Sequence, residues 1–151
     1  MTTAPLRDIA LLLARIGLGV IFIAHGWQKV RTNGLDATTE GFRGMNVPLP
    51  QASAYYAGFV ELIGGAALIL GIFTSIVSIL LLLDMIGAFI FVHGDKGVFV
   101  QDGGFELVLA LGIVALLLAA FGAGRFAVDG VLGGRTSGRT GRFGRNRTFA
   151  R

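Results

Sequence analysis

Four long apolar segments, separated by polar connections, are the feature that most restricts what this chain can fold into. They cover about residues 6–29, 52–72, 74–93 and 105–122. Each is close to the roughly 17 to 25 residues that a helix needs to cross about 30 Å of hydrocarbon. Only 15% of the residues are charged, against roughly a quarter in soluble domains. The sequence therefore predicts an all-α integral membrane protein, a four-helix bundle whose core forms between helices in lipid.

The connections predict how the four segments follow one another. The first segment is expected to remain as a span, because Asp8 interrupts the start that a cleaved signal peptide needs. The loop after it, "RTNGLDATTEGFRGMNVPLPQ", is polar, and its Gly and Pro residues argue against a continuous helix. The connection "GIFTS" is so short that the second and third segments should form a tight antiparallel hairpin. "HGDKGVFVQDGG" leads into the fourth segment, so residues 1–130 are predicted to form one transmembrane domain.

Residues 131–151 form a tail rich in arginine and glycine, which we predict to be disordered. The tail contains no acidic residue, and its arginines are Arg135, Arg139, Arg142, Arg145, Arg147 and Arg151. The positive-inside rule places such a tail in the cytoplasm, and four spans then bring the N-terminus with Arg7 to the same side. Phe143 and Phe149 also suit an arm lying on anionic lipid, where each basic residue contributes about 1 kcal/mol. Nucleic acid is not expected as a partner, because a tail beside a bilayer meets lipid phosphates first.

The first segment carries polar residues along one face. At about 100° per residue, Asp8, Arg15, His25 and Lys29 fall within an arc of roughly 100°. Gln28 points away from this arc, and Lys29 beside Trp27 fits a side chain that reaches the membrane interface.

Three ionisable residues are expected deep in the membrane, where they must face the bundle and find partners. A rise of about 1.5 Å per residue places Arg15 near the midplane, with Glu61 and Asp84 at similar depths. Arg15 is therefore the predicted partner of one or both carboxylates. Arg15 alone cannot pair well with both carboxylates, so one of the two carboxyl groups is a candidate for holding and releasing a proton.

A second polar group is expected at the outer mouth of the bundle, where His25, His93 and Glu106 end or begin their segments. The alternative is that these residues are interfacial or cap helix ends. Their spacing on three different helices is not diagnostic of a metal site. The chain has no cysteine, which excludes disulfides and thiol redox chemistry of its own. The small residues Gly58, Gly64, Gly65, Ala67 and Gly71 predict close helix packing.

Several ordered motifs make the chain resemble the DoxX family of membrane proteins. The first signature is "RIGLGVIFIAHGWQK", and the second is "GFVELIGGAALILGIFT". "MIGAFIFVHGDKG", "DGGFELVLAL" and "GAGRFAVDG" resemble the third span, the start of the fourth and the closing motif, so the likeness covers about residues 9–130. The chain departs from the pattern at Ser75, where a basic residue is expected, and at Ala123 and Ala127, where Pro and Ser are usual.

The resemblance implies a four-helix protein of the bacterial or archaeal cytoplasmic membrane. Some members are associated with thiosulfate oxidation coupled to quinone, and others with membrane complexes that handle oxidative or thiol stress. It leads us to expect a membrane subunit of an oxidoreductase complex that docks a soluble redox partner or offers a quinone site. The alternatives are a non-catalytic anchor or assembly factor, and transport of a small acid or ion, for which four short helices would have to form a homo-oligomer.

On the first hypothesis, Glu61 donates a proton, Arg15 pairs with it or polarises a quinone carbonyl, and His25 or Glu106 connects the site to outside water. The predicted catalytic residues are Glu61, Arg15, Asp84, His25 and Glu106. The predicted quinone-binding residues are Arg15, His25, Lys29, Glu61 and His93.

Overall fold

The computed structural model describes residues 4–129, and within them all regular structure is helical. The helices are α1 (Ala4–Trp27), α2 (Leu35–Gly44), α3 (Pro50–Leu70), α4 (Thr74–Ala88) and α5 (Glu106–Phe121). A π-helical turn, Gln28–Thr32, extends α1, a second one, Phe89–His93, extends α4, and a 3-10 turn spans Val100–Asp102. The predicted tail, residues 131–151, lies outside the described residues.

The predicted all-α membrane architecture is confirmed. Three helical stretches are long and apolar enough to cross a membrane, and they cover Ala4–Thr32, Pro50–Leu70 and Thr74–His93. The fourth predicted span is the shorter apolar helix α5, with 16 residues. The loop between the first two spans contains α2, a helix of 10 residues that the polar, Gly- and Pro-containing sequence did not predict. Gly34, at a φ of 83°, begins this helix, and Pro48 follows it.

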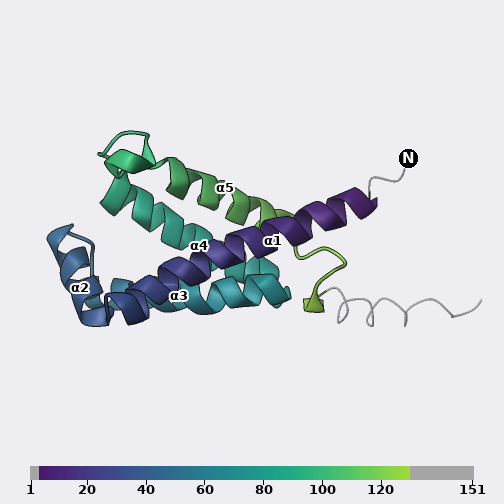
Figure 1. The fold of residues 1–151 in the computed structure, drawn as a ribbon, viewed down its shortest axis with the longest axis horizontal. Coiled ribbons are helices and arrows are strands. Elements are labelled where there is room, and N and C mark those ends of the chain that lie inside the picture. The colour runs from purple at the N-terminus through teal and green to yellow at the C-terminus, as the bar shows by residue number, and fades with distance from the viewer. Residues whose placement is uncertain (1–3, 130–151) are drawn as a thin grey trace, which may run out of the picture.

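The four apolar helices pack mainly as two pairs, α1 on α3 and α4 on α5 (Figure 1). The predicted hairpin is present, because α3 and α4 are joined by Gly71–Phe73 and contact each other. Both ends of the described chain lie at one end of the bundle, which we call the terminal end (Figure 1). The opposite end, with α2 and the connection between α4 and α5, is the loop end.

Glycines seven residues apart on both helices let α1 and α3 approach backbone to backbone. Gly19 of α1 meets Gly65 of α3, so that a Cβ atom added to Gly19 would lie 2.6 Å from the carbonyl oxygen of Gly65. A Cβ atom on Gly26 would lie 2.9 Å from the carbonyl oxygen of Gly58. Close approach at small residues is the usual way helices associate in lipid. The packing role predicted for Gly58 and Gly65 thus has a structural basis, and Gly19 and Gly26 are their partners.

Replacing Gly26 by alanine should destabilise the bundle, although alanine favours a helix by about 1 kcal/mol over glycine. The added methyl group would also lie 2.8 Å from the Cα atom of Leu62, so the two backbones must separate. We expect Gly26→Ala to lower the free energy of unfolding by about 1–3 kcal/mol. Thermal unfolding in mild detergent measures this change. Gly17→Ala, on the same helix with no atom within 4 Å of the new methyl group, is the control and should be neutral or stabilising.

Candidate functional site

The closest buried ion pair among the described residues joins Lys29 to Glu61. The Lys29 Nζ atom lies 2.6 Å from the Glu61 Oε2 atom, and Glu61 is only 3% exposed. Lys29 belongs to the π-helical turn that follows α1, and such turns are frequent at functional sites. Because it pairs with buried Glu61, the Lys29 side chain points into the bundle. The expectation that it reaches outward to the membrane interface is wrong.

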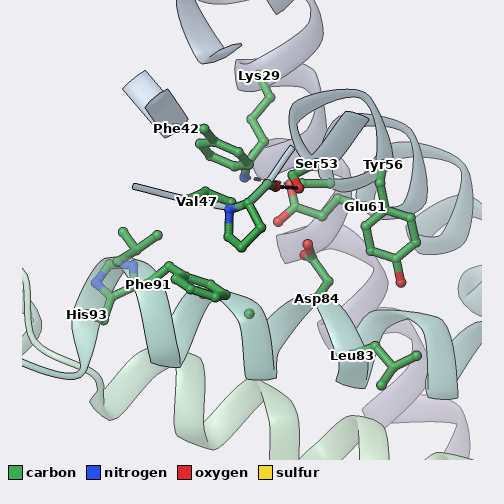
Figure 2. Close-up of a pocket in the computed structure, with 15 residues that line it drawn as sticks. Lys29, Phe42, Val47, Ser53, Tyr56, Glu61, Leu83, Asp84, Phe91 and His93 are labelled. Atoms are coloured by element: carbon green, nitrogen blue, oxygen red, sulfur yellow. Dashed lines mark hydrogen bonds and ion pairs between the residues drawn. The ribbon is translucent and has the colours of Figure 1, made fainter. Parts of the chain in front are cut away.

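Glu61 and Lys29 line a cavity of about 350 Å³, which we call the α3–α4 cavity. Asp84 lines it from α4, and its carboxyl group points toward that of Glu61 (Figure 2). The cavity is lined by Lys29, Phe42, Val47, Pro48, Ser53, Tyr56, Ala57, Glu61, Leu83, Asp84, Gly87, Ala88, Phe91, Val92 and His93. A second carboxyl group thus lies beside the Lys29–Glu61 pair in a mostly apolar site, an arrangement suited to holding a proton.

The polar groups around the carboxyls already have partners that fix their orientation. The Tyr56 hydroxyl donates to the backbone oxygen of Leu80 at 2.7 Å. The Nδ1 atom of His93 lies 2.6 Å from the backbone oxygen of Gly103. Because that oxygen only accepts, Nδ1 carries the proton and Nε2 is the acceptor nitrogen of the neutral ring. The carboxyls of Glu61 and Asp84 and the amine of Lys29 are therefore the groups best placed to meet a ligand.

Helix α2 covers the loop end of the α3–α4 cavity. Phe42, from α2, and Val47 and Pro48, which follow it, all line the cavity. The Thr38 hydroxyl, also in α2, shares its one proton between the backbone oxygens of Gly34 at 2.9 Å and Lys29 at 3.1 Å, and the second contact links α2 to the turn that carries the lysine. This cover was not predicted, because nothing in the polar loop sequence marks Phe42 as facing Glu61.

The predicted pairing of Arg15 with Glu61 or Asp84 is wrong. Arg15 is fully buried, and its Nη1 atom donates to the backbone oxygen of Leu68 at 3.3 Å while its Nη2 atom donates to that of Phe126. Since α1 and α3 run in opposite directions, Arg15 reaches the last turn of α3 and lies away from Glu61. A cation there complements the negative end of the helix.

A segment after α5 closes the terminal end of the bundle around Arg15. Asp129 accepts hydrogen bonds from the backbone nitrogens of Phe73 (2.9 Å) and Thr74 (2.8 Å), where α4 begins. Its own nitrogen donates to the backbone oxygen of Gly71 at 3.0 Å. Gly71, at a φ of 70°, ends α3, and any Cβ atom there would collide with Arg15. Asp129 therefore caps α4 from a distance along the chain, and Arg15 is part of the same packing.

Of the three residues expected at the outer mouth, only His93 lines the α3–α4 cavity. Glu106 instead accepts a hydrogen bond at 2.7 Å from the backbone nitrogen of Val100, which stabilises the connection before α5. His25 and Glu106 do not line the cavity, and residues 4–129 contain no cluster of three potential metal ligands. The three side chains form no common site among the described residues, because Glu106 turns to Val100, although His25 and His93 are electrostatic neighbours. The catalytic and quinone-binding roles themselves stay predictions.

Fold and site together define a small helical membrane protein with an acidic cavity within its spans. Residues 10–94 match the DoxX family, and the chain belongs to this family. It is 35% identical over 122 residues to CatD of Bacillus subtilis, which is named as a candidate oxidoreductase, with 81% of this chain and 86% of that protein covered.

Two further relatives are the inner membrane proteins YqjF and YphA of Escherichia coli. YqjF is 30% identical, with 84% of this chain and 95% of the relative covered. YphA is 27% identical, with 82% and 90% covered. The chain is accordingly a multi-pass protein of the bacterial inner membrane. No solved structure matches it.

Removing the amine of Lys29 should leave a buried carboxylate without its partner. We expect Lys29→Met to lower the free energy of unfolding by about 3–5 kcal/mol. In the double variant Lys29→Met/Glu61→Leu the uncompensated charge is gone, so most of the stability should return. Unfolding curves of the purified protein in mixed micelles measure both changes, and additive losses in the double variant would contradict the pairing.

Proposed function

We propose that this protein is the membrane subunit of an oxidoreductase assembly and that its α3–α4 cavity binds the headgroup of a quinone. The observation that carries the proposal is the buried pair of Lys29 and Glu61 with Asp84 beside it. The likeness to CatD, named as a candidate oxidoreductase, supports the same class of function.

The lining of the cavity fits a quinone headgroup in both shape and chemistry. The aromatic rings of Phe42 and Phe91 lie on its walls (Figure 2) and suit a flat ring. The Lys29 amine is a donor for a quinone carbonyl oxygen. A bound quinone would supply two-electron, two-proton redox chemistry.

In this proposal Glu61 and Asp84 hold and deliver protons, while Lys29 orients the ring and releases its hydrogen bond to Glu61 as the charges change. In the proposal the electrons come from a soluble redox partner that docks on the membrane subunit. The chain has no cysteine, so it offers no thiol relay of its own. Arg15 has no role in this site, since it is bound to backbone oxygens at the terminal end.

Glu61→Gln removes the proton-holding group while keeping its size. We expect the variant to fold and its quinone-dependent turnover to fall by about 100-fold or more, in line with the loss of a general acid. The measurement is quinone reduction by the assembly extracted gently from membranes, with mass spectrometry of bound lipophilic molecules. Glu40→Gln is the matched control, because Glu40 is exposed on α2 and pairs only with Arg43. Full turnover in Glu61→Gln would remove Glu61 from the mechanism.

The second candidate function, a non-catalytic anchor or assembly factor, is favoured by one observation. Arg15, the residue expected to act beside Glu61, serves helix packing instead. Recovery of a soluble redox enzyme without any quinone in the same extraction would support the anchor.

We further propose that the terminal end faces the cytoplasm and the loop end faces outward. Arg7 and Arg125 lie at the terminal end, and the arginine-rich residues 135–151 follow it in the sequence. The positive-inside rule favours this orientation, and the same tail suits contact with anionic lipid. A green fluorescent protein fused after Arg151 should therefore fluoresce, whereas alkaline phosphatase fused there should be inactive. Phosphatase inserted after Asp95, in the connection before α5, should be active; the reverse pattern would contradict the orientation.

A further inference from the structure

We infer that the α3–α4 cavity opens sideways into the bilayer, between α3 and α4, and that it admits a membrane-dissolved ring compound whose apolar tail stays in lipid. This inference deepens the proposed function, on which it rests for the identity of the ring. It adds the route of entry, the need for a tail, and the residues that form the opening.

The exposed residues that line the cavity within the spans come from both helices. Tyr56 of α3 is 40% exposed, and Leu83 of α4 is 54% exposed. Phe91, in the turn that extends α4, is 38% exposed. These side chains surround the carboxyls of Glu61 and Asp84 in Figure 2. Leu83 and Phe91 lie in Thr74–His93, which is long and apolar enough to cross a membrane, and we take exposed side chains of such a span to face lipid.

The water-facing end of the cavity is covered instead. Phe42, Val47 and Pro48 lie over it, and Thr38 fastens α2 to the backbone of Lys29. The Ser53 hydroxyl donates to the backbone oxygen of Pro48 at 2.7 Å, which holds the segment after α2 against the start of α3. A ligand arriving from water would have to displace this cover, whereas a ligand arriving from lipid would not.

Tyr56 sets the edge of the opening that lies toward the terminal end. Its hydroxyl reaches across from α3 to the backbone oxygen of Leu80 on α4 at 2.7 Å. Leu80 precedes Asp84 by one helical turn, so the bond closes the seam between the helices just before the carboxyls. The opening therefore lies between Tyr56 and the cover formed by α2.

Gly87 provides the room for a tail. It lines the cavity one residue before Ala88, and a Cβ atom there would have no atom within 4 Å. Unlike Gly26 or Gly65, this glycine serves no close helix contact. A large side chain at this position should fold normally and fill the opening.

The first test compares two substitutions of the same kind. Gly87→Trp should weaken the binding of decylubiquinone to the protein in lipid nanodiscs by about tenfold or more, which corresponds to about 1.4 kcal/mol. Gly17→Trp is the matched control, because Gly17 lies on α1, also has open space around it and does not line the cavity. If the wild-type protein binds decylubiquinone, equal affinity in the two variants would overturn the lateral opening.

The second test does not depend on quinone. The chain has no cysteine, so Gly87→Cys and, separately, Val47→Cys each carry one nitroxide label. Electron paramagnetic resonance then measures collisions with oxygen, which concentrates in lipid, and with a nickel chelate, which stays in water. We expect oxygen to dominate at residue 87 and the nickel chelate at residue 47.

Dominance of the nickel chelate at residue 87 would overturn the lateral opening even if quinone binds. If oxygen dominates there but the wild-type protein binds no decylubiquinone, the opening stands and the quinone of the proposed function fails. The two inferences are thus separated.

Discussion

The close contact of α1 with α3 is the interaction on which the rest of the structure depends. Gly19 against Gly65 and Gly26 against Gly58 bring the two backbones together and fix their relative height. With that height fixed, the turn after α1 places Lys29 against Glu61 near the middle of α3. A side chain at Gly19, Gly26 or Gly65 would meet backbone atoms of the partner helix and separate the two helices. The buried carboxylate would then lose its partner in a medium that cannot solvate it.

The same antiparallel arrangement divides the polar groups of the first span between two ends with different tasks. At the terminal end, Arg15 and Asp129 satisfy backbone groups where α3 ends and α4 begins. Between the middle of the bundle and the loop end, Lys29, Glu61 and Asp84 line a cavity, and their charged groups form no hydrogen bond to the backbone. Buried charge at the terminal end therefore stabilises the helix ends. In the cavity, the buried charged groups are available to bind a ligand or a proton.

The α3–α4 cavity combines an acidic centre with aromatic and aliphatic walls and a helical cover. Phe42 of α2 lines its loop end, and the exposed liners within the spans belong to α3, to α4 and to the turn that extends α4. A cavity built in this way suits a ligand that is dissolved in the bilayer and that exchanges protons with a carboxyl group of the protein. Membership of the DoxX family agrees with such a role but does not specify it, because function depends on the site more than on the fold.

The sequence by itself determined the class of protein, because hydrophobic length and composition are local properties. The apolar segments, the membrane location, the short α3–α4 connection and the family were all readable from it, and Glu61 was identified as a buried acid. Only the tertiary structure decided that Lys29, and not Arg15, pairs with Glu61, and that α2 covers the site. A helical periodicity gives the face of a residue on its own helix. Which residue it meets depends on the height and direction of the neighbouring helix, and here glycine contacts between α1 and α3 set both.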